Sequence, residues 1–571
     1  MTSTRRARAA RVVVGRSGAG RGALAVVTAV TLSLAMLASA CGSAKGGTAN
    51  QTGGTSAGAT SSGREPADEK PQNGGSMTIS VPFESDTWNA ATAEWSQSGS
   101  LVASSVLEPL AKLNSRGGAD PYLATSWIAD STFTKWAINI RPGVKFSDGT
   151  PLDAKAVALN FNTYVHGALT GQVLGPIFKD VKVTGPQQVL IEFKQPWAAF
   201  PSAYLDGNGD MMMAPAMIHS KDGGATHPIG TGPFVFQSWT PGDSFKVTRN
   251  PNYWQKGLPH LDSITFRVIS DESTAVSALQ NGDLDMVLSQ DAHSANKLAS
   301  SFTVVKDWES ETISALSNTV ASINGAANPL SDIHARRALA YATDRAAIAK
   351  LEGPGVEAAT SPWAPTRPWG MPDSQTGYVN YDQAKAKQEV AAYEKDTGQK
   401  SLTITLSTTS DQDALSIGQA LQAQWAAVGI KTNISSMDEA ALIKRLIGAD
   451  FELVYLKNYN YPDPDVDKVF WESSTVKGVG QININFNMFK SAAMDADLNK
   501  GSESGYPAQR KAAYDDLVHQ LNSNVLNVWL FRTPYSLIAS KQVRGLNTAR
   551  DVPFGNYYPK TWLGDLWLQQ S

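Results

Sequence analysis

The stretch from residue 401 to residue 457 constrains the fold more than any other part of the sequence. Apolar residues alternate over 402–406, 430–434 and 451–455, which predicts three strands. Two segments with helical spacing separate them; their apolar residues are Ile417, Leu421, Trp425 and Val428 in the first, and Leu442 and Leu446 after a candidate N-cap, Asp438, in the second. This β-α-β-α-β order is typical of a parallel or mixed sheet covered by helices.

Shorter patterns of the same kind lie elsewhere in the chain. Alternating apolar residues predict strands around 136–140 and 189–193. Asp153 precedes apolar residues at helical spacing, and 271–282 has an acidic start and an Asn-Gly end, so both segments predict capped helices. The fold class is therefore α/β. The chain has 571 residues, of which 42 % are hydrophobic, which is enough for several domains or two large lobes.

The N-terminus contains a basic region, an apolar run and then a cysteine. Residues 1–22 carry six arginines and no acidic residue, and the apolar run 23–38 is shorter than the ~20 residues of a membrane-spanning helix. Small residues then precede Cys41, which resembles the lipobox of bacterial lipoproteins with Leu37 one position further from the cysteine than is usual. We predict a signal peptide over 1–40 and lipidation of Cys41; ordinary cleavage that leaves a free cysteine is the alternative.

A polar segment follows the predicted lipidation site. Residues 42–76 contain no Val, Ile, Leu, Phe, Trp or Tyr, so they cannot bury enough apolar surface to offset their ordering entropy. We predict a flexible tether over 41–76 that holds a globular body at the outer face of the cytoplasmic membrane. Removal of 1–40 changes the net charge from −3 to −9, which excludes a generally basic nucleic-acid binder. The single cysteine excludes an internal disulfide or a multi-cysteine metal site.

No enzyme motif stands out in the body. The seven histidines are not spaced as a zinc-binding helix face, and Gly230-Thr231-Gly232 lacks the rest of a phosphate loop, so we expect a turn that leads into a strand at Phe234. The acidic run 463–467 lacks the glycine and glutamate of a calcium loop and predicts a solvated turn. We therefore expect no catalytic residue, no metal and no cofactor.

Aromatic and amide residues follow the last predicted strand of the β-α-β-α-β stretch. Residues 458–465 contain two Tyr, two Asn and two Pro. Ligands in open α/β sheets bind beyond the carboxyl ends of strands, so this segment is a candidate ligand-binding wall.

Several motifs, in order along the chain, resemble the extracellular solute-binding proteins of ABC importers, the large family that includes oligopeptide-, dipeptide- and nickel-binding proteins. The longest match is the strand and turn over 136–154, which resembles R-x-G-V-x-F-x-D-G-x-P-[LF]-x-A. The other matching segments lie at 123–127, 228–234, 249–262, 278–285 and 336–345. Together the resemblance covers about 77–545.

The resemblance implies two lobes that close on a ligand about a hinge. The first lobe would comprise 77–312, with an extra subdomain, and a return segment at 537–571; the second would comprise 313–536. It also implies a monomeric substrate-binding lipoprotein that captures a peptide or peptide-sized polar solute and delivers it to a membrane permease with ATPase subunits. An exported lipoprotein hydrolase, and a sensor or adhesion protein that binds without transport, are the competing classes.

The resemblance places candidate ligand-binding residues on both lobes. The candidates are Trp88, Asn89, Glu94 and Trp95 on the first lobe, and Trp363, Tyr459, Asn460, Tyr461 and Asp463 on the second. Peptide binders of the family often have Asp at the position of Asn460, where its carboxylate pairs with the α-amine of the peptide. A neutral amide cannot neutralise a buried ammonium. Asp463 or Asp465 could substitute; otherwise the ligand is a blocked peptide, an oligosaccharide or another polar metabolite.

Overall fold

The computed structural model describes residues 69–93, 95, 97–114, 118–167, 170–205, 211–289, 291–410, 412–458, 463–546 and 563–570. The predicted signal peptide, Cys41 and most of the predicted tether lie outside these ranges. Across the described ranges, none of the helices combines the length and the apolar character needed to cross a bilayer.

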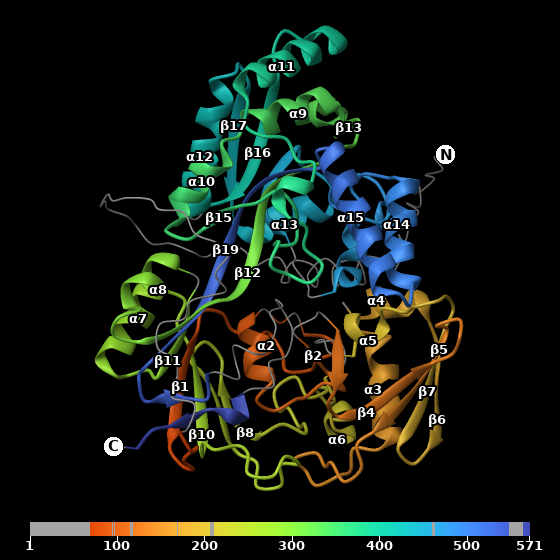
Figure 1. Cartoon of the computed structure of the whole chain (residues 1–571), viewed down its shortest axis with the longest axis vertical. Coiled ribbons are helices and arrows are strands. Elements are labelled where there is room, and N and C mark those ends of the chain that lie inside the picture. Colours follow the sequence, from red (N-terminus) through yellow and green to blue (C-terminus); the bar gives the residue numbers. More distant parts are fainter. Residues whose placement is uncertain are drawn as a thin grey trace, which may run out of the picture.

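A mixed, 11-stranded sheet extends through most of the molecule (Figure 1). Its order is β17-β16-β18-β12-β19-β11-β1-β10-β9-β8, and β15 pairs with β19. The strands are β1 (Ser76–Val81), β8 (Phe234–Thr240), β9 (Ser244–Arg249), β10 (Ser263–Val268), β11 (Met286–Ser289), β12 (Thr303–Ser317), β15 (Glu357–Ala358), β16 (Thr403–Thr409), β17 (Lys431–Met437), β18 (Leu453–Asn458) and β19 (Asn527–Ala539).

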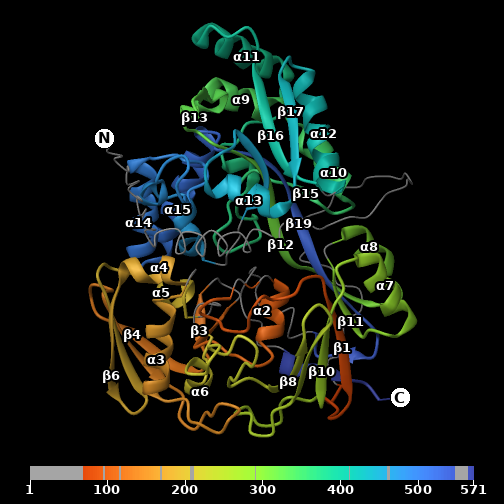
Figure 2. The ribbon, with the colours of Figure 1, turned by 180° about the vertical axis from the view of Figure 1, so that it is seen from behind.

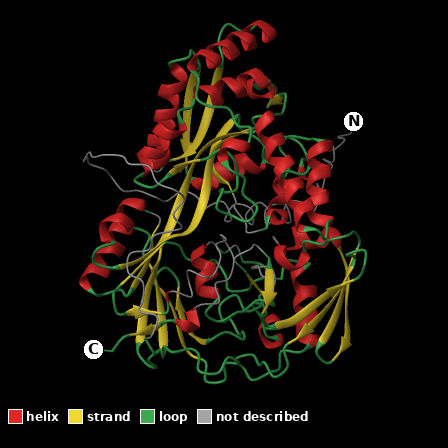
Figure 3. Cartoon of the chain, in the orientation of Figure 1, coloured by secondary structure: helices red, strands yellow, loops and turns green. Residues whose placement is uncertain are grey.

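Two long strands of this sheet, β12 and β19, connect the lower and the upper half of the molecule. They pair antiparallel from Thr303↔Ala539 to Leu316↔Asn527. At one end β19 pairs with β11, and at the other end β12 pairs with β18. Figure 3 shows both strands crossing from one half to the other.

The lower half combines the β11-β1-β10-β9-β8 part of the large sheet with a separate antiparallel sheet, β4-β5-β7-β6. One apolar core, with members between Met77 and Val305 and between Leu537 and Leu566, joins the two sheets. The other elements here are β2 (Ala111–Leu113), β3 (Ala119–Pro121), β4 (Ala124–Ala129), β5 (Lys135–Ile140), β6 (Phe178–Gly185), β7 (Gln188–Phe193), β20 (Val543–Arg544), β21 (Trp567–Leu568), α2 (Gln97–Ala103), α3 (Ala154–Tyr164), α4 (Thr170–Ile177), α5 (Phe200–Ala203), α6 (Pro215–Ile218), α7 (Glu272–Asn281), α8 (Ala292–Leu298) and η6 (Leu563–Asp565).

The upper half is built on β17-β16-β18, with helices packed against these strands and a helix pair, α14 and α15, beside them (Figures 1 and 2). Its main apolar core runs from Ile313 to Phe531 and shares no residue with the core of the lower half. The other elements are β13 (Ser322–Ile323), β14 (Ala326–Ala327), α9 (Ile333–Ala342), α10 (Arg345–Glu352), α11 (Gln383–Thr397), α12 (Gln412–Ala426), α13 (Glu439–Ile447), η4 (Pro464–Phe470), α14 (Ala492–Glu503) and α15 (Pro507–Ser523), with short 3-10 turns at Pro329–Ser331, Asp373–Gln375 and Ser473–Thr475.

The local sequence predictions of secondary structure are confirmed. The β-α-β-α-β stretch forms β16, α12, β17, α13 and β18, and β16 is parallel to both β17 and β18. Side chains at three predicted N-caps accept hydrogen bonds from the first helical turn: Asp153 on α3, Asp271 on α7 and Asp438 on α13. Gly282 ends α7 with φ +83°, a conformation that favours glycine.

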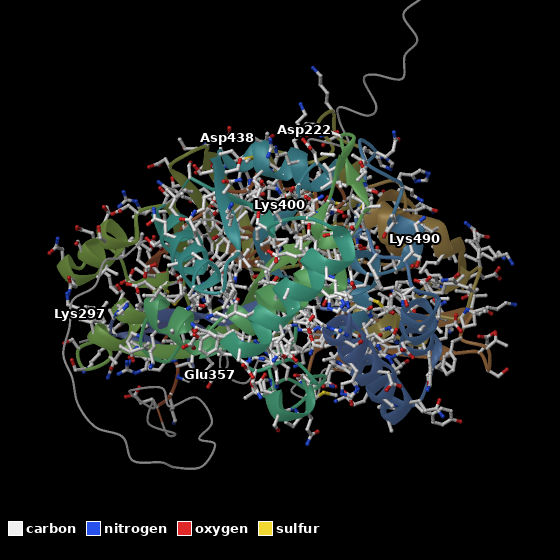
Figure 4. The ribbon with its side chains drawn as sticks, turned by 90° about the horizontal axis from the view of Figure 1, so that it is seen from above. Asp222, Lys297, Glu357, Lys400, Asp438 and Lys490 are labelled. Carbon is white, nitrogen blue, oxygen red and sulfur yellow. The ribbon has the colours of Figure 1, made fainter. Side chains whose placement is uncertain are left out.

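Polar side chains cover the outside of the molecule, and the end of the predicted tether lies against it. Exposed charges such as Asp222, Lys297, Lys400 and Lys490 are seen at the surface in Figure 4.

Within the predicted tether, Gly74 donates its amide to the His260 carbonyl at 2.9 Å. The end of the predicted tether is therefore held against the body through polar backbone groups.

Candidate functional site

The upper and lower halves contact one another at the start of η4, which follows β18 in the chain. The candidate residues Tyr459, Asn460 and Tyr461 lie between these elements and outside the described residues, as does Glu94. The structure resumes at Asp463, whose side chain is fully buried and caps η4 by accepting the Asp465 amide at 3.0 Å. Figures 1 and 2 show α14 and α15 of the upper half above α4 and α5 of the lower half.

Two side chains, in addition to the Asp465 amide, hold the carboxylate of Asp463. Arg510, in the first turn of α15, donates Nη2 to both oxygens at 2.6 and 2.8 Å, and Ser202 of α5 donates its hydroxyl at 2.5 Å. Burial lowers the pKa of the Arg510 guanidinium, but the charge of Asp463 outweighs this and the pKa lies above its ordinary value. Asp463 and Arg510 therefore form a buried, charged ion pair.

Arg510 is itself fixed by its neighbours. Its guanidinium lies over the rings of Trp369, at 4.7 Å from the centroid, and Tyr514, at 5.8 Å. Its Nε donates to the Gly501 carbonyl of α14 at 2.7 Å. The ion pair therefore ties η4 to both helices of the α14–α15 pair.

The acidic run 463–467 is buried, so the prediction of a solvated turn is wrong. Asp463, Asp465 and Asp467 are 0 %, 7 % and 1 % exposed. Asp465 Oδ2 accepts the indole N–H of Trp197, from the lower half, at 2.6 Å, while its Oδ1 has no partner. Burial raises the pKa of Asp465. The turn is tolerated inside the protein because donors from distant segments reach its carboxylates.

The predicted residue Trp363 lies beside the same turn. Its indole N–H donates to Asp467 Oδ2 at 3.2 Å, and its ring packs edge-on against Trp471 and Tyr514. Trp363 is 2 % exposed. The structure thus brings Trp363 and Asp463 into one cluster of the upper half.

Three predicted residues of the lower half form a second cluster, after β1. Trp88 packs against Trp95, Trp239 and Phe245, and its buried indole N–H has no partner. The hollow beside it has a volume of about 10 Å³, room for about one water molecule.

The polar groups of Trp95 and Asn89, the other two members of this cluster, are occupied within the lower half. Trp95 donates its indole N–H to the Thr87 carbonyl at 2.8 Å. Asn89 donates to the Gly223 carbonyl at 2.8 Å and accepts from the Ala91 amide at 2.9 Å. Both side chains hold the loop between β1 and α2 in place, and their predicted ligand contacts stay predictions.

Three residues that bind the carboxylates of the acidic turn were missed by the sequence analysis: Trp197, Ser202 and Arg510. Trp197 and Ser202 are 268 and 261 positions away from the carboxylates that they reach. The residues around a single Trp, Ser or Arg form no local pattern that predicts a partner so far away in the sequence. The one available signal was the number of acidic groups in the turn, which require donors if they are buried.

A buried carboxyl group also explains several matching motifs of the lower half. Glu108 is 1 % exposed and accepts hydrogen bonds from Tyr122, Tyr253, Trp254 and Thr231 at 2.6 to 3.0 Å. Burial raises the pKa of Glu108, and the four donors oppose that shift. These motif residues therefore hold the lower half together, and the turn predicted at Gly230-Thr231-Gly232 leads into β8 as expected.

A family model agrees with this architecture. The model of the bacterial extracellular solute-binding proteins, family 5, matches residues 119–481. The chain belongs to this family. Among the described residues, no group of three or more His, Cys, Asp or Glu side chains is arranged to hold a metal ion.

The similar proteins include binding proteins for several solutes. A probable D,D-dipeptide-binding periplasmic protein of Escherichia coli is 26 % identical over 437 residues, covering 74 % of this chain and 81 % of that protein. A nickel-binding periplasmic protein of Escherichia coli is 24 % identical over 80 % of this chain and 90 % of its own length. A glutathione-binding protein of Salmonella paratyphi A is 30 % identical over 59 % of this chain and 65 % of its own.

Solved structures share the fold. The oligopeptide-binding protein AppA of Bacillus subtilis, in complex with a nonapeptide, has a TM-score of 0.71 and 21 % identity, covering 88 % of this chain and 100 % of that one. AgaA of A. tumefaciens R10, in complex with agropinic acid, has a TM-score of 0.71 and 21 % identity, covering 87 % and 99 %. The predicted α/β fold of this family is confirmed.

Proposed function

We propose that this protein is the substrate-binding lipoprotein of an ABC import system, which captures a peptide or peptide-sized polar solute between its two halves and delivers it to a membrane permease. The observation that carries the proposal is the pair of separate cores joined through β12 and β19. Two bodies on shared strands can close on a ligand by a hinge motion. Binding of the ligand to both bodies then favours the closed state.

The lobe boundaries proposed from the sequence lie within the connecting strands. The boundary at 312/313 divides β12, and that at 536/537 divides β19. Support comes from the cores: the lower core takes its members from 77–305 and 537–566, and the main upper core takes its members from 313–531. The lower half, including the β4-β5-β7-β6 sheet, would be the first lobe.

We further propose that the ligand lacks an unpaired ammonium group. Asn460 stands where peptide binders of the family often carry a carboxylate, and the nearest substitute, Asp463, is already paired with Arg510. Burial raises the pKa of the Asp465 carboxyl group, so this group is a weak counter-ion for an ammonium. A blocked peptide or a non-peptide polar solute fits this charge pattern better than a peptide with a free amine.

The remaining candidate residues stay part of the proposal. Trp88, Asn89, Glu94 and Trp95 would face the ligand from the first lobe, and Trp363, Tyr459, Asn460, Tyr461 and Asp463 would face it or support the wall on the second. Signal cleavage after residue 40, lipidation of Cys41 and the tether would keep the protein at the outer face of the membrane, near its permease. Two acyl chains anchor a protein stably.

A binding screen tests the ligand proposal. The purified chain is mixed with matched peptides with free and acetylated N-termini, and with polar non-peptide solutes, and the thermal midpoint is measured. We expect blocked peptides or non-peptide solutes to raise the midpoint. We also expect Asn460→Asp to gain affinity for peptides with a free amine, while Asn433→Asp, on an exposed site of β17, changes nothing. Preferential binding of free-amine peptides by the unmodified chain would contradict the proposal.

A further inference from the structure

The two halves also contact one another at the acidic turn 463–467, away from the β12–β19 connection. Trp197, just before α5, donates its indole N–H to Asp465 at 2.6 Å. Ser202, within α5, donates its hydroxyl to Asp463 at 2.5 Å. A backbone hydrogen bond joins the Ala199 amide to the Ser502 carbonyl of α14 at 3.1 Å. Three hydrogen bonds thus cross from the lower half to the upper half within one short segment.

The acceptor side of this contact is rigid. Both oxygens of Asp463 are fixed by Arg510, and Arg510 is fixed by Gly501 and by the ring of Trp369. The carboxylate of Asp463 is therefore held by groups of the upper half even without Ser202 and keeps its place when the halves separate. An N–H or O–H that donates to a carboxylate makes a stronger hydrogen bond than one between neutral groups.

The donor side is equally fixed. The ring of Trp197 packs against Phe193 and Phe200 at centroid distances of 5.1 Å each, and its carbonyl accepts the Trp136 indole N–H at 3.2 Å. Trp197 is 3 % exposed and Ser202 is 8 % exposed. Neither donor needs a rearrangement of its own half to reach the carboxylates, so little entropy is lost when the contact forms.

We infer that Trp197 and Ser202, with Asp463, Asp465 and Arg510, form a latch that holds the two halves closed. This inference deepens the proposed function, because it concerns the closure of the same site. The β12 and β19 strands remain paired while the halves move, whereas the latch bonds form only in the closed state. Opening for solute exchange therefore requires the latch to break.

Hydrogen exchange measured on the full-length chain without added solute tests the latch. The double variant Trp197→Phe/Ser202→Ala keeps the aromatic packing and the fold of α5 but removes both side-chain donors. We expect the Ala199 amide, and amides of η4, to exchange about tenfold faster or more, since both lost bonds are to carboxyl oxygens and that of Ser202 is to the charged Asp463. Amides of β16 and β5, inside the two halves, should keep their rates.

The matched control is Trp425→Phe/Ser105→Ala. Both control residues are buried donors whose bonds stay inside one half, Trp425 to Thr343 at 2.9 Å and Ser105 to the Val102 carbonyl at 2.6 Å. The control should leave the Ala199 amide unchanged. The latch is refuted if the double variant leaves that amide at its original rate, or if β16 and β5 accelerate as much as Ala199 does. Because no solute is present, this outcome is independent of whether the proposed ligand class is correct.

Discussion

Removal of the Arg510 side-chain charge should destabilise the protein strongly. Arg510→Met leaves Asp463, which is 0 % exposed, without its buried counter-ion. Breaking a buried pair by removing one partner costs about 3–5 kcal/mol, because an uncompensated charge stays in the interior. The same change also removes the bond to the Gly501 carbonyl and the contact with Trp369.

A matched control separates the buried pair from the loss of an arginine in general. Arg445 lies 3.9 Å from Asp450, and both side chains are about two-fifths exposed, at 42 % and 43 %. Exposed pairs contribute about 0–1 kcal/mol, so Arg445→Met should have a small effect. Urea unfolding, followed by tryptophan fluorescence and circular dichroism, gives the two free energies of unfolding.

A second variant tests whether the buried charge is the cause. Asp463→Asn removes the negative charge that Arg510→Met leaves behind, so the double variant should be more stable than Arg510→Met alone. The reasoning is refuted if Arg510→Met costs no more than Arg445→Met, or if adding Asp463→Asn brings a further loss.

Three further predictions concern other buried groups. Burial raises the pKa of Asp565 to about 6, so between about pH 4 and pH 6 the folded chain keeps a proton that the unfolded chain has lost. The contribution of Asp565 to the free energy of unfolding should therefore fall as pH rises from about 4 to about 6. Asp565→Asn should remove that fall in urea midpoints measured across this range. Glu108→Gln should cost about 1–3 kcal/mol for each donor that meets the amide NH2 instead of an oxygen, and a variant as stable as the parent would contradict the account of Glu108. Gly230→Ala should destabilise the protein, because the added Cβ would lie 2.1 Å from the Val106 carbonyl oxygen. Gly418→Ala, in α12, should stabilise it by up to about 1 kcal/mol, because no neighbouring atom lies nearer than 3.7 Å to the added Cβ. Equal effects of the two changes on the free energy of unfolding would count against the close-packing argument.

Local structure could be predicted from the sequence because its causes are local. Asp153, Asp271 and Asp438 each cap a helix through the amide three positions further on, and the stripe of Ile417, Leu421 and Trp425 is buried as its spacing requires. The family motifs added the overall architecture, since they mark segments at known places in a shared fold.

The acidic turn could not be predicted because its partners are far away in the sequence. The rule that Asp residues in turns are solvated holds where no donor is at hand, and here Trp197, Ser202 and Arg510 supply the donors. The same tertiary contacts place Asp463 in an ion pair. The carboxylate of Asp463, a predicted ligand group, is thereby already paired with Arg510.

Capture of a solute between the two halves is the central claim, and native mass spectrometry of the protein purified from its own host without refolding tests it most directly. We predict a complex with one small solute per chain, released on mild denaturation, whose fragments identify a blocked peptide or a polar non-peptide. If the isolated chain carries no solute and none of the peptides and polar solutes of the screen binds at one per chain, the claim is contradicted.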